Sequence, residues 1–247
     1  MSTLLQIPCL VLAVPCVYVC WIPPTIAEDN EIVVQETLFT HLTHAAGWLN
    51  LIFQGSIYLL KAIIIGMLYM QSGTSGHSRP VQDYDSSLYW GASALCLNHD
   101  PTRLAQPTQL FYGGFLCMVI ATIIRLQSYH AMENQFTFDV SLRSGHKLIT
   151  AGPYQYVRHP GYTGFFLVVA SGLAMIYTKG SWLRECGALE SRLGKVLVAA
   201  FMTWWVNVVV RLWRRIETED KLLKAKFGTQ WTEWKRKVPY KLIPAVY

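Results

Sequence analysis

Charged residues are scarce in this chain of 247 residues. Asp, Glu, Lys and Arg make up 15% of it, whereas roughly 25% is usual for a soluble domain. So few charges do not cover the surface of an ordinary soluble protein, which disfavours that class. Hydrophobic residues make up 52% instead, which favours helices that face lipid.

Several signatures of common enzyme and binding folds are missing. The six cysteines form no CxxC pair, so zinc ribbons and redox dithiols have no support, and Cys16 and Cys20 are expected to be buried thiols. His41 and His44 lack a third ligand, so we expect no metal site. No phosphate-binding loop or G-x-G-x-x-G follows a strand pattern, which argues against the soluble nucleotide-binding folds. No nucleic-acid partner is expected, because no recognition module is present.

The charge that is present is unevenly placed. The formal net charge is +6, from 21 Lys and Arg against 15 Asp and Glu. Residues 211–247 hold ten of the basic residues and four of the acidic ones, so the other 210 residues carry eleven of each sign. The whole excess therefore lies in the C-terminal tail.

Five apolar stretches indicate membrane-spanning helices, which need ~20 mostly apolar residues. They cover residues 4–22, 45–70, 110–126, 162–177 and 195–213. The predicted fold class is an all-α integral membrane protein with about five transmembrane helices, and four or six are left open. The third stretch ends at Arg125, which we expect near an interface. Residues 86–97 are apolar but too short to cross alone, and we place them in a loop or a re-entrant segment.

The last two stretches predict an orientation, because two consecutive crossings return the chain to the side from which it started. If both cross the membrane, the loop 127–161 and the tail after Trp213 lie on the same side. The ten basic residues of the tail predict that this side is cytosolic.

The first group of chemically informative residues runs from this loop into the fourth stretch. Between Gly145 and Gly164 the sequence is GHKLITAGPYQYVRHPGYTG. Pro160 restricts His159 to extended conformations and suits the first turn of a helix. His159 is therefore expected at a helix N-terminus, where free N–H groups favour anions. Interfacial anchoring explains any one of these residues, but their density favours a site.

The second group is a stripe on the last helix. Asn207, Arg211, Arg215 and Glu219 recur every four residues and share one face, which places Arg215 and Glu219 to pair. Two interpretations have equal weight. One is snorkelling with a surface ion pair worth ~0.3–0.5 kcal/mol, and the other is a charged face that contacts a polar ligand.

Apolar residues continue along the tail at helical spacing, at Leu223, Phe227, Trp231 and Trp234, with basic residues between them. This pattern predicts a basic amphipathic helix, broken or kinked near Gly228, that lies at the interface against anionic membrane lipid. Packing on the protein's own cytosolic face is the equally open alternative.

Together these groups resemble the isoprenylcysteine carboxyl methyltransferase family. The first block of the resemblance comprises His146-x-x-Ile149, Gly152-Pro153-Tyr154 and Arg158-His159-Pro160-Gly161-Tyr162-x-Gly164. The second block comprises Arg215, Glu219-Asp220, Phe227-Gly228, Trp231, Trp234 and Lys235-Arg236-Lys237-Val238-Pro239. The resemblance covers residues 136–240 and keeps the order and spacing of both blocks.

The resemblance implies S-adenosylmethionine as methyl donor and prenylcysteine, or a prenylated protein C-terminus, as acceptor at the endoplasmic reticulum membrane. Residues 1–108 are then N-terminal membrane helices and loops, and 109–247 a methyltransferase core with a cytosolic cofactor loop at 136–164 and a C-terminal helix at 195–240. Asp139 stands where better-known members place a Gln and is a further candidate cofactor contact. The acceptor is assigned to Arg215, and cofactor binding to His146, Lys147, Leu148, Ile149, Tyr154, His159, Pro160, Gly161, Tyr162 and Glu219.

These assignments suit methyl transfer to a carboxylate. An α-carboxyl with a pKa of about 3.5 is ionised at pH 7 and needs no general base. Arg215 would hold both acceptor oxygens, Glu219 would accept hydrogen bonds from the cofactor, and the turn 159–162 would supply backbone N–H groups. Two other functions are left open: methylation of another lipophilic acceptor such as a phospholipid amine, and a catalytically silent membrane adaptor.

Overall fold

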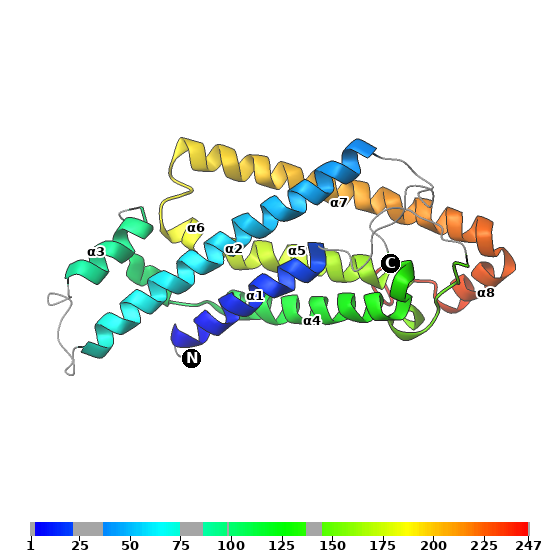
Figure 1. Ribbon diagram of the computed structural model, residues 1–247, viewed down its shortest axis with the longest axis horizontal. Helices are drawn as coiled ribbons and strands as arrows, with labels where there is room; N and C mark the ends of the chain where they lie inside the picture. Colours follow the sequence, from blue (N-terminus) through cyan, green and yellow to red (C-terminus); the bar gives the residue numbers. More distant parts are fainter. Residues whose placement is uncertain (1–2, 22–36, 75–85, 98, 137–144, 247) are drawn as a thin grey trace. The chain divides into compact units, whose positions relative to one another are not determined.

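The computed structural model describes residues 3–21, 37–74, 86–97, 99–136 and 145–246 (Figure 1). All regular secondary structure in these residues is helical, as predicted. The long helices are α1 (Gln6–Trp21), α2 (Thr37–Thr74), α4 (Gln109–Met132), α5 (Pro160–Tyr177) and α7 (Arg192–Phe227). The short ones are α3 (Ser86–Leu95), α6 (Trp182–Glu185) and α8 (Thr229–Lys237).

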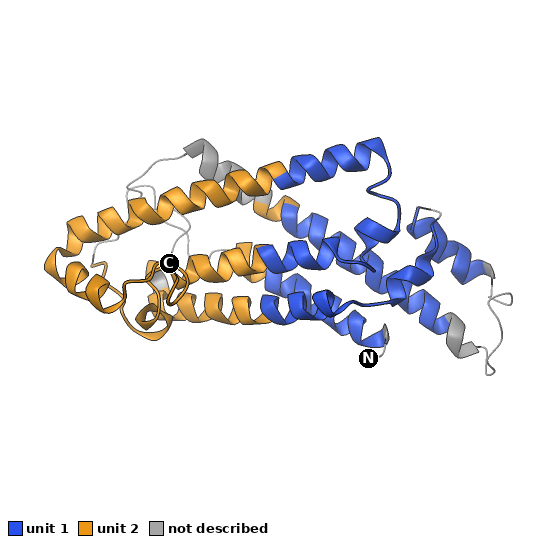
Figure 2. Cartoon of the chain, turned by 180° about the vertical axis from the view of Figure 1, so that it is seen from behind, with its two compact units in different colours: residues 1–17, 50–118, 170–202 blue, residues 18–49, 119–169, 203–247 orange. Residues whose placement is uncertain are grey.

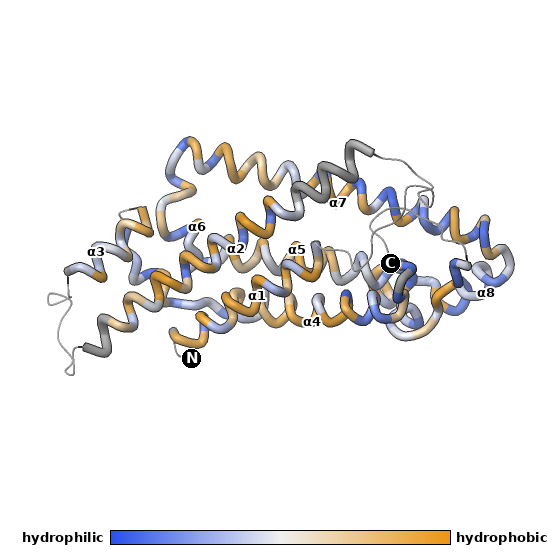
Figure 3. Tube along the Cα trace, in the orientation of Figure 1, coloured by the Kyte–Doolittle hydropathy of each residue, from blue (hydrophilic) through white to orange (hydrophobic). Residues whose placement is uncertain are grey.

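Four helices in the described part of the chain are long and apolar enough to cross a membrane. They are Gly47–Met70, Gln109–Met132, Pro160–Glu185 and Arg192–Phe227, and they confirm four of the five predicted spans. Figure 3 shows apolar residues along α2, α4 and α5 and a change to hydrophilic residues toward the end of α7.

In the remaining stretch, residues 4–22, the structure describes α1 over Gln6–Trp21, which has 16 residues. At 1.5 Å per residue it is about 24 Å long, shorter than the ~30 Å hydrocarbon core of a bilayer. Most of residues 86–97 form α3, so their placement in a loop is wrong, and the re-entrant segment stays a prediction. Ala92 and Cys96, four residues apart, are both fully buried, so the helix forms by packing one face into a core.

The described chain divides into two compact units, each built from three segments (Figure 2). Unit 1 comprises Met1–Val17, Asn50–Met118 and Ala170–Met202. Its core joins α2, α3 and the residues around α6 through Ile64, Ala92, Cys96, Leu104 and Cys186.

A disulfide joins Cys96, just after α3, to Cys186, just after α6. The two Cα atoms are 4.6 Å apart, although the residues are separated by 90 positions. The cysteine spacing does not indicate this pair, because only the fold brings the two ends together. Cys16 and Cys20 are free thiols, as predicted, but only Cys20 is fully buried.

Unit 2 comprises Tyr18–Leu49, Val119–Val169 and Thr203–Tyr247. In it α4 and α5 pack closely at Gly164, where an added Cβ would lie 2.8 Å from the Ala121 carbonyl oxygen. A backbone oxygen at that distance cannot move aside cheaply, so the close approach requires glycine.

Arg125 is buried in unit 2, with 5% of its surface exposed. Its guanidinium donates to the Gly161 carbonyl at 2.7 Å and to the Cys20 carbonyl at 3.1 Å. The Cys20 carbonyl is at the end of α1, where helical carbonyls lack partners within the helix. Arg125 therefore connects α1 and α4 to the first turn of α5.

Candidate active site

The candidate site begins at the start of α5. Pro160 is the first residue of the helix and His159 precedes it, which confirms the helix start predicted from Pro160. Arg158 and His159 are buried, at 3% and 6% exposure. Their backbone N–H groups donate to the carbonyls of Tyr240 and Lys241, both at 2.9 Å.

Residues 238–242, which we call the C-terminal strap, cap this helix start. Besides the two backbone bonds, the Arg158 guanidinium donates to the carbonyls of Val238 at 3.3 Å and Pro239 at 2.9 Å. The Thr163 hydroxyl donates to the Leu242 carbonyl at 2.7 Å. Every carbonyl of the strap is therefore hydrogen-bonded to α5 or to the two residues before it.

The strap corrects one expectation about the turn 159–162. The N–H of His159 is not offered to an anion, because it donates to Lys241. The N–H of Tyr162 donates to the His159 carbonyl at 3.1 Å, and Pro160 has no N–H. Side chains, more than backbone N–H groups, therefore define the chemistry of this turn.

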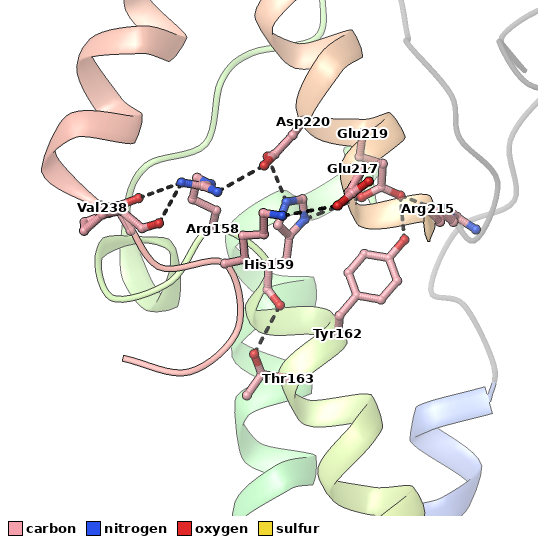
Figure 4. A network of polar contacts seen from close by, with 11 residues as sticks. Arg158, His159, Tyr162, Thr163, Arg215, Glu217, Glu219, Asp220 and Val238 are labelled. Carbon is pink, nitrogen blue, oxygen red and sulfur yellow. Dashed lines mark hydrogen bonds and ion pairs between the residues drawn. The ribbon is translucent and has the colours of Figure 1, made fainter. Parts of the chain in front are cut away.

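Asp220 of α7 holds both residues that precede α5. Its Oδ1 lies 3.0 Å from Nε2 of His159, and its Oδ2 accepts from a terminal nitrogen of Arg158 at 3.1 Å (Figure 4). Asp220 is itself 8% exposed. Both carboxylate oxygens of a buried acid are thus satisfied, as burial of a charge requires.

Glu219, the preceding residue, gathers a second set of partners. The Tyr162 hydroxyl donates to its Oε1 at 2.6 Å, and Nε of Arg215 donates to the same oxygen at 2.8 Å. Its Oε2 lies 3.6 Å from Nδ1 of His159. Four of the predicted site residues therefore meet in one network, and Figure 4 shows them converging between α5 and α7.

The His159 ring lies between two carboxylates. Burial alone lowers the pKa of His159, but the hydrogen bonds and charges of Asp220 and Glu219 outweigh burial and raise this pKa above its ordinary value. The ring is therefore favoured in its protonated form, with one N–H directed at each acid.

The outer half of the predicted stripe joins this network. The predicted pairing of Arg215 with Glu219 is confirmed, and both side chains are about one-fifth exposed. Asn207 is exposed, and its amide donates to the Thr203 carbonyl of its own helix at 2.9 Å. Arg211 is exposed as well.

The loop that precedes α5 packs on α8. Tyr154 is buried in an aromatic cluster with Trp231 and Trp234, and Leu148 and Ile149 pack against the same cluster. Burial raises the pKa of the Tyr154 hydroxyl, so it stays protonated at neutral pH. This cluster positions the central part of the predicted cofactor loop.

The two remaining loop residues lie at the beginning of the described loop. The His146 ring centroid is 6.2 Å from that of Phe227, the last residue of α7. The backbone N–H of Lys147 donates to the Gln135 side chain at 2.6 Å. Asp139 lies outside the described residues.

The aromatic cluster also shows how the tail packs on the rest of the protein. α7 ends at Phe227 and α8 begins at Thr229, with φ of +53° at Gly228 between them, so the predicted break is confirmed. Trp231 and Trp234 are buried at 4% and 6% exposure against the protein's own loop. Trp231 and Trp234 of the amphipathic face therefore pack on the protein, and contact of this helix with membrane lipid stays a prediction.

Comparison with known proteins supports the resemblance stated from the motifs. The model of the isoprenylcysteine carboxyl methyltransferase (ICMT) family matches residues 114–182. This range contains the first motif block and not the second.

Curated relatives agree with this match. Protein-S-isoprenylcysteine O-methyltransferase B of Arabidopsis thaliana is 28% identical over 128 residues, which cover 51% of this chain and 55% of the relative. A probable protein-S-isoprenylcysteine O-methyltransferase of Oryza sativa subsp. indica is 29% identical over 133 residues, which cover 51% and 58%. A Delta(14)-sterol reductase of Mus musculus is 28% identical over 104 residues, which cover 42% and 21%. The chain spans about half the length of the methyltransferases it matches.

Proposed function

We propose that this chain is an integral-membrane methyltransferase that moves a methyl group from S-adenosylmethionine to the C-terminal carboxylate of prenylated cysteine. The observation that carries the proposal is the network in which Arg215, Tyr162 and His159 meet at Glu219. In this network Arg215, which would bind the acceptor carboxylate, lies next to Glu219, which would bind the cationic cofactor. The likeness to named isoprenylcysteine methyltransferases supports it.

The described residues fit the chemistry of the proposed cofactor. In this part of the chain Leu148, Ile149 and Thr150 form no backbone hydrogen bonds, and the first two pack on the aromatic cluster. Such a segment offers edge hydrogen bonds and apolar contact to an adenine ring. Glu219 would hold the hydroxyl or ammonium groups, together with the other assigned residues His146, Lys147, Tyr154, Pro160 and Gly161.

When bound, S-adenosylmethionine supplies an electrophilic methyl group on a sulfonium. The protein's own task is then to hold an ionised carboxylate in line, and such positioning is worth up to ~7–11 kcal/mol. Arg215 would bind this carboxylate through its planar guanidinium. Glu219, four residues further along α7, fixes the orientation of that guanidinium through Nε.

The network favours a carboxylate over an amine as acceptor. Methylation of an amine requires a base that removes a proton. His159 is not available as this base, because Asp220 and Glu219 favour the ring in its protonated form, which cannot accept a further proton. A carboxylate acceptor needs no base, so the donors and acceptors observed around Glu219 suffice.

We place the chain as a multi-pass protein of the endoplasmic reticulum with a cytosolic C-terminus. The excess of positive charge in residues 211–247 supports this orientation. The disulfide between Cys96 and Cys186 supports it independently, because structural disulfides form in oxidising compartments such as the lumen. α5 begins at the site and the span ends at Glu185, next to Cys186, so the proposal puts the disulfide in the lumen.

The function is tested with the purified full chain in nanodiscs and radiolabelled S-adenosylmethionine. We expect label to be transferred to N-acetyl-farnesylcysteine and not to its methyl ester, in which the carboxylate is blocked. Transfer to phosphatidylethanolamine in place of farnesylcysteine would overturn the proposal in favour of a lipid amine methyltransferase. Failure to bind S-adenosylmethionine by calorimetry would favour an adaptor.

The orientation is tested in sealed microsomes. Free thiols are blocked, a membrane-impermeant phosphine reduces accessible disulfides, and a maleimide-polyethylene glycol then labels the released thiols. We expect two labels per chain only after detergent permeabilisation, and none in the Cys96→Ser, Cys186→Ser double variant. Two labels in sealed vesicles would place the disulfide on the cytosolic side and refute the orientation.

A further inference from the structure

Asp220 is a buried acid with both carboxylate oxygens hydrogen-bonded, yet nothing in the proposed reaction requires it. Its two oxygens bind two residues that are adjacent in the sequence, His159 at 3.0 Å and Arg158 at 3.1 Å. All three residues are more than nine-tenths buried. A buried acid that holds two buried basic side chains is costly to assemble unless its geometry serves a purpose.

Asp220 defines the state of the His159 ring. An ionised carboxylate can only accept hydrogen bonds, so Nε2 of His159 must carry a proton to donate to Asp220. The other ring nitrogen, Nδ1, then faces Oε2 of Glu219 at 3.6 Å. Consecutive residues on α7 are about 100° apart around the helix, which lets Glu219 and Asp220 approach the ring from two sides.

Asp220 also joins three segments that are far apart in the sequence. Through Arg158 it is connected to the strap carbonyls of Val238 and Pro239. Through His159 it is connected to the start of α5. The third residue of this helix is Tyr162, which donates a hydrogen bond to Glu219. The position of Glu219 relative to α5 therefore depends on the contact between Asp220 and His159.

We propose that Asp220 is a positioning residue of the methyl-transfer site: it holds His159 with a proton on Nε2 and directs Nδ1 toward Glu219, and so orients the cofactor-binding acid. The inference rests on the proposed function. It assigns Asp220 no contact with cofactor or acceptor, and it assigns Arg158 the task of holding Asp220 to the strap.

The charged and titratable neighbours of this cluster come from all elements packed on it. Glu219 faces the ring directly, and the others act around it: Arg158 on Asp220, Arg215 and Tyr162 on Glu219, and Lys241 of the strap, 3.7 Å from Glu217. Because His159 is favoured as a cation between two acids, removing one negative charge lowers its pKa. Its proton is then lost at a lower pH.

The test is the Asp220→Asn variant of the full chain, assayed with S-adenosylmethionine and N-acetyl-farnesylcysteine. We expect KM for S-adenosylmethionine to rise about tenfold with a smaller change in kcat. The alkaline limb of the pH profile of kcat/KM should move to lower pH by about 1 unit, as loss of one nearby charge implies. Asp220→Glu, which restores the charge, should move the limb back toward the wild-type position.

Glu233→Gln is the matched control, because Glu233 is an exposed acid on α8, the next helix, and among the described residues makes no contact with this cluster. It should change neither KM nor the pH profile. If Asp220→Asn only lowers the active fraction or the melting temperature, with KM and the pH limb unchanged, Asp220 is structural and the inference is wrong.

A second measurement separates this inference from the proposed function. NMR titration of labelled histidine, with His159→Gln to assign the signal, reports the His159 pKa without any turnover. A lower His159 pKa in Asp220→Asn supports the positioning contact, and an unchanged pKa refutes it. An inactive wild-type chain would refute the proposed function and leave this readout intact.

Discussion

Replacing Arg215 by Lys is expected to lower kcat/KM for the prenylcysteine acceptor by roughly 10–100-fold. A planar guanidinium can donate two parallel hydrogen bonds to a carboxylate, whereas an ammonium acts as a single point charge. A hydrogen bond to a charged group is worth ~1.5–3 kcal/mol, and each 1.36 kcal/mol corresponds to about a factor of ten in rate. Lys keeps the positive charge, so the loss of kcat/KM measures the contribution of the two parallel hydrogen bonds of the guanidinium.

Affinity for S-adenosylmethionine should stay close to the wild-type value in this variant, because Lys keeps the i,i+4 ion pair with Glu219. Arg214→Lys is the matched control, since Arg214 is adjacent in the sequence and exposed, and its kinetics should not change. Initial rates at varied N-acetyl-farnesylcysteine check both variants. Wild-type kcat/KM in Arg215→Lys would remove Arg215 from the acceptor site.

Local periodicity predicts much of the fold, because a membrane span and a helix break are both local features. Long apolar runs indicate four helices that the structure confirms, and Gly228 marks the boundary between α7 and α8. Hydropathy does not predict where helices end. α7 continues to Phe227, beyond the apolar run that stops at residue 213, because its charged residues are good helix formers and no breaker precedes Gly228.

The site divides in the same way. The pairing of Arg215 with Glu219 follows from a spacing of four residues, so the sequence predicts it. The contacts of Asp220 do not follow from any spacing, because Arg158 and His159 lie 62 and 61 residues away. The one available signal is the presence of an acid next to Glu219 and of a second basic residue next to His159 within the two motif blocks.

The sequence indicates the role of the strap even less, because the strap contacts α5 and the residues before it through backbone carbonyls. Every residue has a backbone carbonyl. The side chains of residues 238–242 therefore do not indicate that this segment caps α5. The expectation of a free N–H group was wrong at His159 for this reason. The acceptor of that N–H is the Lys241 carbonyl, which lies about 80 residues further along the chain.

Replacing Glu219 by Gln is expected to weaken S-adenosylmethionine binding by roughly 10–100-fold, again from ~1.5–3 kcal/mol for a charged hydrogen bond. The Tyr162 hydroxyl and Nε of Arg215 both donate to Oε1, and Nδ1 of His159 faces Oε2. An amide has one accepting oxygen, and its NH2 group would face one of these donors.

The same substitution removes the negative charge that lies between two cationic side chains, Arg215 and the protonated His159. The pKa of His159 should therefore fall, and the loss of affinity should grow as pH rises, because a neutral ring with its proton on Nε2 no longer donates from Nδ1 to the side chain of residue 219. Isothermal calorimetry at pH 6.5 and 8.5 measures both effects, with Glu233→Gln as control, since Glu233 is an exposed acid on α8. Unchanged affinity in Glu219→Gln would mean that this acid only orients Arg215, and the cofactor would then have to be held by the loop residues 146–154 alone.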